Sequence, residues 1–228
     1  MKIGIILTSD IRSKAYLQKC IKNNLHFESV IFMNDQKREK EFDKNIIELS
    51  KQYNFDISES VSTTLKNNSI SNMEFPFIDI NEQKLIDYLK KLEIDYVIFT
   101  GGGILKKEIL SLGIKFIHLH PGIVPDYRGS TCFYYSILNE NYAGVTSFIM
   151  DESLDTGDII FQKKFEKPNH QYLDEIFDPH IRSETLIELL KNKSNINKKN
   201  QQNKDSGETY FIIHPVLKHI AILRCIND

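Results

Sequence analysis

The sequence of 228 residues contains few cysteines, and none of them is placed to pair with another. Cys20, Cys132 and Cys225 are odd in number, lie far apart and form no Cys-x-x-Cys motif. This pattern argues against a disulfide framework and against a cysteine-based zinc site. We expect three buried, inert thiols.

The chain also lacks an excess of charge and a long apolar run. Its 29 Lys and Arg against 31 Asp and Glu give a net charge of -2, so bulk charge attracts neither a nucleic acid nor an anionic membrane. No apolar run approaches the roughly 20 residues that cross a bilayer. The amino-terminal "MKIGIILTSD" lacks the length and cleavage pattern of a signal peptide. We therefore expect a cytosolic protein without nucleic-acid or membrane partners.

What the chain does contain is a regular alternation of apolar runs and amphipathic segments. Strand-like apolar runs occupy residues 2–9, 29–34, 95–103 and 114–122, and segments with helical spacing lie between them. Strands that are apolar throughout and alternate with helices are typical of an α/β fold with a largely parallel central sheet. The polar stretch 58–72 has little to bury, and we expect a loop or a loosely packed insertion there.

The carboxyl-terminal half continues with a helix around 131–138, two strand-like pieces that flank the acidic turn "DESLDTGD", and a helix after Pro179. Residues 191–207 are almost purely polar and have no period, which predicts a flexible connector. The apolar content returns in 208–228, which predicts strands or a small appendage that packs on the core or on a partner chain. We therefore expect a main domain at 1–190, followed by the connector and the appendage. If the appendage packs on a partner chain, the protein is a homodimer.

The stretch "FIHLHPGIVPDYRGS" places two histidines at the end of a predicted buried strand. Because side chains alternate along a strand, His118 and His120 project to the same face. Pro121 and Gly122 then end the strand at once. Since ligands of open α/β sheets bind beyond the carboxyl ends of the strands, this position indicates a functional site.

The residues alone leave three interpretations of these histidines open. They can be satisfied polar side chains at a strand end, or they can bind a metal together with carboxylates such as Asp151, Asp155 or Asp158. Alternatively, His120 transfers protons and a carboxylate of the acidic turn orients it. No HExxH motif or similar cluster completes a zinc site, so we predict no metal.

"HLHPGIVPDYRGS" followed by "GVTSFIMDESLDTGDII" resembles the folate-dependent formyltransferases over roughly residues 95–161. The resemblance implies a Rossmann-like catalytic domain and the transfer of a formyl group from 10-formyltetrahydrofolate to a primary amine. It implies that His120 and Asp155 take the places of the family's catalytic histidine and aspartate. His118 stands where the family has an asparagine, which is expected to donate a hydrogen bond to the formyl oxygen. Gly122 stands where many members have serine.

The resemblance also implies where the folate and the amine bind. The family borders the folate pterin with two segments, which here implies contacts by Gly103, Ile104, Leu105, Met150, Asp151 and Leu154. Contacts to the amine substrate are expected from Tyr127 and Arg128, which follow the catalytic histidine as in the family. Ser9 and Arg12 do not reproduce a phosphate loop of the family, but they lie at the amino end of the first predicted helix, and we expect them to contact a phosphate of the substrate there. For Tyr127 and Arg128, packing of the loop is an equally good interpretation.

The short chain and the helix after Pro179 resemble the sugar N-formyltransferases within this family. The resemblance therefore implies formyl transfer to a small-molecule amine, with a nucleotide-linked amino sugar as the favoured acceptor. Two alternatives stay open. One is a hydrolase on the same scaffold, which releases formate from formyltetrahydrofolate or uses a metal held by His118 and His120. The other is a binding protein whose catalytic site is disabled.

Overall fold

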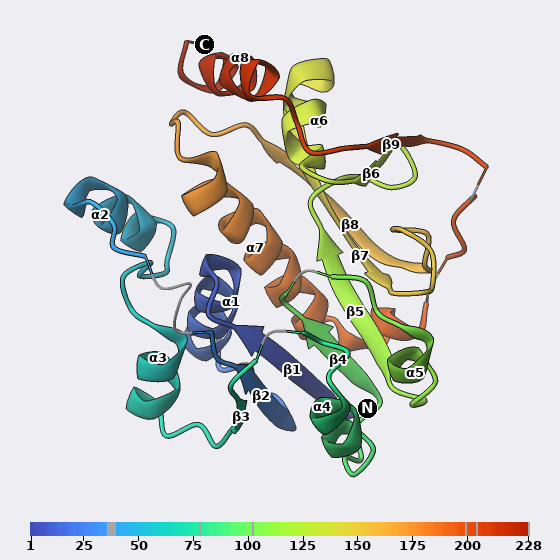
Figure 1. The fold of residues 1–228 in the computed structure, drawn as a ribbon. Helices are drawn as coiled ribbons and strands as arrows, with labels where there is room; N and C mark the ends of the chain where they lie inside the picture. The colour runs from blue at the N-terminus through green and yellow to red at the C-terminus, as the bar shows by residue number, and fades with distance from the viewer. Residues whose placement is uncertain (36–39, 78, 102, 199, 204, 228) are drawn as a thin grey trace. The chain divides into compact units, whose positions relative to one another are not determined.

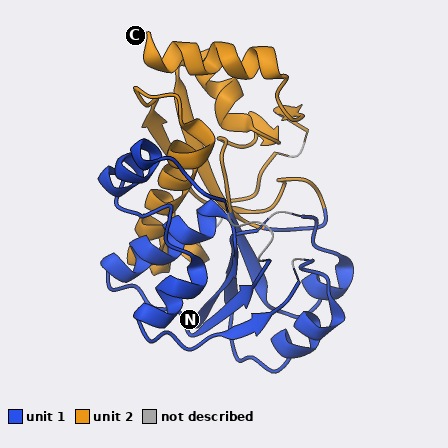
Figure 2. Ribbon diagram, turned by 60° about the vertical axis from the view of Figure 1, so that its left-hand side comes forward, with its two compact units in different colours: residues 1–118, 150–152 blue, residues 119–149, 153–228 orange. Residues whose placement is uncertain are grey.

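The computed structural model describes most of the chain as two compact units. The described residues are 1–35, 40–77, 79–101, 103–198, 200–203 and 205–227. Residues 1–118 and 150–152 form the first unit, and residues 119–149 and 153–228 form the second (Figure 2). Gly102 of the "TGGG" turn lies outside the described residues.

The first unit is built on a parallel sheet. Its strands, in spatial order, are β3 (Met73–Phe75), β2 (Ser29–Met33), β1 (Ile3–Thr8), β4 (Tyr96–Phe99) and the first part of β5 (Lys115–His120). Each neighbouring pair runs parallel, and Figure 1 shows β1, β2 and β4 side by side. All six residues of β1 are buried, as expected for a strand covered on both faces. The α/β prediction is confirmed.

Among the residues that the structure describes in the first unit, several helices connect or flank these strands. They are α1 (Ile11–Lys22), α2 (Lys44–Gln52), α3 (Val61–Asn67), α4 (Gln83–Leu89) and α5 (Lys107–Leu110). The Asp10 carboxylate caps α1 by accepting a hydrogen bond of 2.9 Å from the backbone N–H of Ser13. Such a cap satisfies one of the unpaired N–H groups at a helix start. No helix within the described part of the chain is both long and apolar enough to cross a membrane.

The prediction of a loop or a loosely packed insertion at residues 58–72 is wrong, because this stretch contains the packed helix α3. The Ser60 hydroxyl accepts a hydrogen bond from the N–H of Thr63 and so caps the helix. Val61 and Leu65 lie one turn apart, and both are buried. Two apolar residues at this spacing and one cap are enough for a short helix that packs on the unit, although the stretch as a whole is polar.

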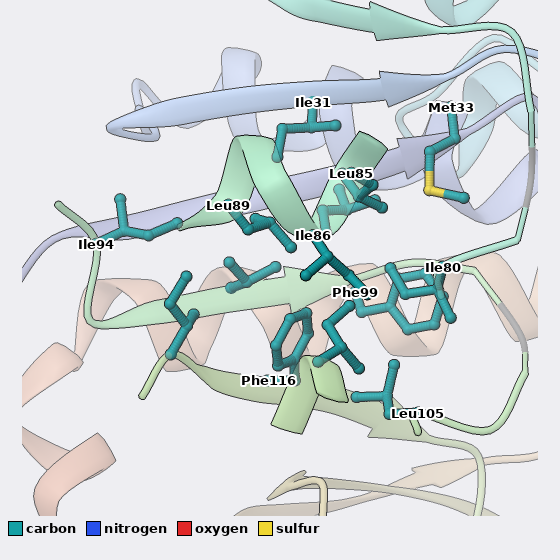
Figure 3. Packing of buried hydrophobic residues seen from close by; sticks show 14 residues of the cluster. Ile31, Met33, Ile80, Leu85, Ile86, Leu89, Ile94, Phe99, Leu105 and Phe116 are labelled. Carbon is teal, nitrogen blue, oxygen red and sulfur yellow. The ribbon is translucent and has the colours of Figure 1, made fainter. Parts of the chain in front are cut away.

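A hydrophobic cluster stabilises α4 and α5 against the sheet of the first unit. Leu85, Ile86 and Leu89 of α4 pack together with Phe99 of β4 and Phe116 of β5 (Figure 3). These positions of α4 are the apolar face that the helical spacing of residues 81–94 predicts. The cluster therefore fixes the two strands whose carboxyl ends lead to the "TGGG" turn and to the histidine segment.

In its described residues, the second unit combines an antiparallel pair of strands with helices and two short strands. Its elements are β6 (Tyr127–Gly129), α6 (Cys132–Glu140), β7 (Tyr142–Ile149), β8 (Ile159–Glu166), a π-helix at Leu173–Phe177, α7 (Asp178–Lys191), a 3₁₀ helix at Lys193–Asn197, β9 (Glu208–Tyr210) and α8 (Pro215–Ile226). Strands β7 and β8 are antiparallel, and β6 pairs in parallel with β9. The two strands predicted around the acidic turn are confirmed as β7 and β8.

The expected connector at 191–207 has structure and internal contacts. It contains the 3₁₀ helix, in which Ile196 is fully buried, and Asn200 forms an antiparallel bridge with Ile159 of β8. The appendage at 208–228 contains one short strand and the helix α8, so it is more helical than the sequence predicts. Several apolar side chains of this appendage are largely exposed, among them Phe211 and Ile212.

We predict that Leu89→Ala lowers the free energy of unfolding by about 2–5 kcal/mol, because it leaves a cavity in the α4 cluster. Urea denaturation measures this change. Lys84→Ala is the matched control, since Lys84 is exposed on the same helix and its loss should change stability by less than about 0.5 kcal/mol. Equal effects of the two substitutions would contradict the packing that we describe.

Candidate functional site

His120 is the last residue of β5, and its ring is held on both sides. The side chain is only 2% exposed. Its Nε2 lies 2.8 Å from the carbonyl oxygen of Tyr127. A carbonyl can only accept, so Nε2 carries a hydrogen and donates it. Nδ1 faces Oδ2 of Asp155 at 3.4 Å. The neutral ring is therefore the Nε2–H tautomer, and the nitrogen that can take up a proton faces a carboxylate.

The turn between β7 and β8 presents Asp155 to this ring. The Asp155 backbone is left-handed, with φ of 53°, which is uncommon outside glycine, asparagine and aspartate. Its Oδ2 accepts a hydrogen bond of 2.7 Å from the backbone N–H of Gly129. A Cβ at Gly157 would lie 1.6 Å from the carbonyl oxygen of Ile149, so the turn closes only around a glycine. The Asp-x-Gly spacing of the sequence thus has a direct geometric reason.

Gly122 gives the Tyr127 carbonyl room to reach the histidine. A Cβ at this position would lie 2.6 Å from the Tyr127 carbonyl oxygen and 2.8 Å from Nε2 of His120. Contacts this short mean that the backbone or the ring must shift before a side chain fits at Gly122, so the observed hydrogen-bond geometry depends on the glycine. The glycine where many family members have serine is therefore part of how His120 is held in this chain.

A buried ion pair on α7 fixes the end of β5 from another direction. Nε of Arg182 lies 2.7 Å from Oδ1 of Asp178. Nη1 of Arg182 donates a hydrogen bond of 2.8 Å to the carbonyl oxygen of Leu119, the residue before His120. Both charged residues are more than nine-tenths buried. A buried pair that also makes hydrogen bonds holds its neighbours in one arrangement, so α7 restricts the backbone that carries the histidine.

Burial is the main electrostatic influence on His120. It lowers the pKa of the imidazole, because the charged ring cannot be solvated. The Asp155 carboxylate and the Tyr127 carbonyl act in the opposite direction, while the positive charge of Arg182 adds to the lowering. His120 is thus neutral at neutral pH and can accept a proton at Nδ1, where the nearby carboxylate would stabilise the imidazolium.

Cys132 lies close to the same site but does not act as a nucleophile at neutral pH. Its side chain is buried, and burial together with the Asp155 charge raises the pKa of the thiol to about 12. A protonated thiol is a poor nucleophile and a poor metal ligand. Among the residues that the structure describes, no group of three or more His, Cys, Asp or Glu is placed to hold a metal ion.

The remaining residues expected to be catalytic or to bind substrate have clear positions. His118 lies two residues before His120 on β5 and is partly buried. The Ser9 hydroxyl donates to Oδ1 of Asn34 at 3.3 Å and accepts from the N–H of Asp35 at 3.0 Å, so it ties the end of β1 to the end of β2. Arg12 lies beside Asp10, with 3.4 Å between Nη2 and Oδ2.

Tyr127 and Arg128 have partners within the second unit. The Tyr127 hydroxyl donates to Oε1 of Glu140 at 2.6 Å, and its ring stacks on Tyr210 at 5.3 Å between centroids. Burial and this hydrogen bond raise the pKa of Tyr127 to about 12. The Arg128 guanidinium donates to the side chain of Gln202 and to two backbone carbonyls of the same segment. These contacts fit the loop-packing interpretation, and a contact to substrate stays a prediction.

The residues expected to border the folate divide into exposed and buried ones. Ile104 is 76% exposed and Leu154 is 56% exposed, so both apolar side chains are accessible to a ligand. Gly103 is exposed with φ of 119°. Leu105 belongs to the hydrophobic cluster of the first unit, and Met150 packs against that cluster. Asp151 is partly buried. Folate contacts by these residues stay predictions. Because the Leu105 side chain is buried in the cluster, we expect any contact of Leu105 with folate to come from its backbone.

Sequence reasoning missed Gln202, the N–H of Gly129 and the pair formed by Asp178 and Arg182. The pair had a usable signal, because two opposite charges stand four residues apart at the start of the predicted helix. Gln202 had none, since it lies in a polar tract of similar residues. A backbone N–H leaves no trace in a sequence at all.

Comparison with known proteins identifies the family of this chain. The formyl transferase family model matches residues 3–178. A methionyl-tRNA formyltransferase of Finegoldia magna is 34% identical over 103 residues, which are 44% of this chain and 33% of that protein. The chain thus spans about a third of the length of this curated relative.

Two solved structures resemble the whole chain. A sugar N-formyltransferase of a Shewanella species has a TM-score of 0.61 at 17% identity, and the match covers 99% of this chain and 88% of the other. An N-formyltransferase of Helicobacter canadensis, solved with folinic acid and dTDP-3-aminofucose, has a TM-score of 0.61 at 21% identity, with 99% and 80% covered. At these identities the likeness establishes the fold. Since the family model matches more than half of the chain, this protein belongs to the folate-dependent formyltransferase family.

Proposed function

We propose that this protein transfers the formyl group of 10-formyltetrahydrofolate to a primary amine of a small substrate. The contact between His120 and Asp155 carries this proposal. The resemblance assigns the family's catalytic histidine and aspartate to these two residues, and their side chains lie close together although they are 35 positions apart in the chain. A buried, neutral imidazole beside a carboxylate is suited to moving one proton at neutral pH.

The chemistry needs one proton to move from the attacking amine to the leaving nitrogen. The amine nitrogen forms a bond to the formyl carbon, and the bond between that carbon and N10 of the folate breaks. The attacking nitrogen loses a proton, and N10 gains one. In the proposal, Nδ1 of His120 and the carboxylate of Asp155 hold this proton between the two steps. The products are the N-formyl amine and tetrahydrofolate.

His118 takes the role of the family's asparagine in this proposal. The oxygen of the formyl group becomes negative when the amine adds to the carbon, and a donor placed at that oxygen stabilises the intermediate. A histidine can donate from one ring nitrogen, whereas an asparagine donates from its amide at any pH. This substitution makes the donor dependent on the tautomer and protonation of His118.

A nucleotide-linked amino sugar is the acceptor that we propose. The match to the sugar N-formyltransferase of Shewanella has a TM-score of 0.61 over 99% of this chain, whereas the match to a methionyl-tRNA formyltransferase of Clostridium thermocellum has a TM-score of 0.52 over 98% of this chain. The net charge of -2 adds no attraction for a transfer RNA. A low-molecular-weight acceptor with an amine and a nucleoside diphosphate therefore fits the chain better than an aminoacyl-tRNA.

We predict that the purified protein formylates a dTDP- or UDP-linked amino sugar and leaves methionyl-tRNA unchanged. Mass spectrometry of the sugar nucleotide and release of tetrahydrofolate measure the reaction. His120→Asn and Asp155→Asn should each reduce turnover by about a hundredfold or more, because each removes one partner of the proton-transferring pair.

Lys84→Ala is the control, and it should keep full turnover. Formate release in the absence of any amine would favour the hydrolase alternative. Binding of folate without turnover on any amine would favour a disabled binding protein. Wild-type turnover in both His120→Asn and Asp155→Asn would contradict the roles that we assign.

We predict that acid weakens the native protein through His120. The folded-state pKa of His120 lies below the value of about 6.5 in the unfolded chain, so the unfolded chain binds the proton first as the pH falls. Stability is therefore full above about pH 7 and declines as the pH falls below 6.5 towards the folded pKa. The decline due to this one group is at most about 1.4 kcal/mol per pH unit.

Urea denaturation of the wild type and of His120→Asn at pH 7.5 and 5.5 isolates this contribution. The stability advantage of the wild type should shrink at pH 5.5, because the variant has no imidazole at this position to protonate. An advantage that stays constant or grows in acid would show that His120 is not buried as a neutral ring.

We predict that His118→Asn keeps formyl transfer within about tenfold of the wild type, because the amide restores a donor that does not depend on protonation. His118→Ala removes the donor and should lower kcat by about a hundredfold. Steady-state kinetics with the same amino sugar measures both. Full activity of His118→Ala would exclude His118 from the stabilisation of the intermediate.

A further inference from the structure

Both polar atoms of the Gln202 side-chain amide form hydrogen bonds within the second unit. Its Nε2 donates to the carbonyl oxygens of Asp155 at 3.1 Å and Gly157 at 2.6 Å. Its Oε1 accepts from Arg128, at 3.1 Å from Nη2 and 3.4 Å from Nε. Gln202 is 9% exposed and Arg128 is 5% exposed. An amide whose donors and acceptor are all in use has one defined orientation.

The two carbonyls that Gln202 binds belong to the turn that presents the Asp155 carboxylate. This turn needs support, because a non-glycine residue with φ of 53° persists only where the surrounding structure holds it. Gly157 lets the turn close against Ile149, but a glycine has no side chain that can fix the backbone further. Gln202 supplies that restraint from 47 positions farther along the chain.

The side chain and the backbone of Asp155 are held by different groups. The N–H of Gly129 binds Oδ2 at 2.7 Å, and Gln202 binds the backbone carbonyl of the same residue. The Asp155 side chain has two rotatable bonds, so the hydrogen bond from the Gly129 N–H to its carboxylate does not by itself fix the Asp155 backbone. With both ends held, Oδ2 stays 3.4 Å from Nδ1 of His120. Displacements of about 1 Å in such an arrangement lower rates about a hundredfold.

We propose that Gln202 is a positioning residue for formyl transfer, and that it holds the Asp155–Gly157 backbone so that the Asp155 carboxylate stays on His120. This inference rests on the proposed function for its kinetic consequence, but the geometry it describes does not depend on the identity of the substrate.

Arg128 attaches the chain segment around Gln202 to β6 by bonds that are independent of the Gln202 side chain. Arg128 also donates to the backbone carbonyls of Asn203 and Ser206, each at 2.8 Å. These two bonds do not involve the Gln202 side chain, so the segment keeps its attachment to Arg128 when Gln202 changes. A substitution at Gln202 can therefore test the turn without releasing the segment.

Two substitutions with side chains of similar length separate support of the Asp155–Gly157 turn from attachment to Arg128. Gln202→Met removes the donors and the acceptor without adding charge. Gln202→Glu keeps an acceptor for Arg128 but cannot donate to the carbonyls of Asp155 and Gly157. Gln201→Met and Gln201→Glu are the matched controls, because Gln201 is the exposed neighbour.

Kinetics with the amino sugar gives the first measurement. We expect Gln202→Met and Gln202→Glu each to lower kcat about tenfold or more with little change in KM for the formyl donor. Both controls should behave as the wild type. If Gln202→Glu has wild-type kcat, attachment to Arg128 is all that Gln202 provides, and the proposal is overturned. Thermal unfolding checks that every variant folds.

An NMR titration of the His120 ring gives a second measurement that needs no turnover. His120→Asn identifies the resonance. The charged groups that act on this ring are Asp155, Asp178 and Arg182. In Gln202→Met, loss of the Asp155 contact removes a group that raises the pKa of His120, so this pKa should fall by about one unit or more.

The titration decides the inference even if the proposed function fails. A protein without formyl transfer in which Gln202→Met still lowers the pKa of His120 would overturn the function and support the positioning role. A His120 pKa in Gln202→Met equal to that of the wild type and of Gln201→Met would overturn the positioning role, whatever the activity.

Discussion

The approach of a carboxylate to a buried imidazole is the interaction on which this site depends. Nδ1 of His120 and Oδ2 of Asp155 lie 3.4 Å apart, and most of the unusual features of the second unit serve this contact. The missing side chain at Gly122 lets a carbonyl fix the ring. The missing side chain at Gly157 lets the turn close. The left-handed backbone of Asp155 then aims its carboxylate at the ring.

Burial gives this contact its chemical character. An exposed histidine would be partly charged near neutral pH, but desolvation keeps His120 neutral and able to accept a proton. The same burial makes every unpaired polar group nearby costly. This explains why Arg182 is paired with Asp178 and with a backbone carbonyl, and why the amide of Gln202 is fully hydrogen bonded. Burial of the imidazole and full hydrogen bonding of the polar groups around it therefore occur together.

Much of the fold was predictable because local patterns encode it. Fully apolar runs predicted the buried parallel strands, and helical spacing in residues 81–94 predicted the buried face of α4. Prediction failed where a small number of residues decides the outcome. In the polar stretch 58–72, one cap at Ser60 and the pair Val61 and Leu65 are enough for α3 once they pack on the unit. Composition averaged over the stretch hides such a signal.

The sequence by itself determined the alternation of strands and helices, the end of β5 at a proline and a glycine, and the spacing of Asp155 and Gly157. Each of these is a property of neighbouring residues, which constrain one another through backbone geometry. The residues alone left the aspartate that meets His120 open, and the family resemblance pointed to Asp155. Only the tertiary structure decided that the Asp155 carboxylate lies beside the His120 ring, that Arg128 has internal partners, and that one glutamine of a polar tract holds the turn. Polar side chains of one type are alike in sequence, and they differ only in what the folded chain places beside them.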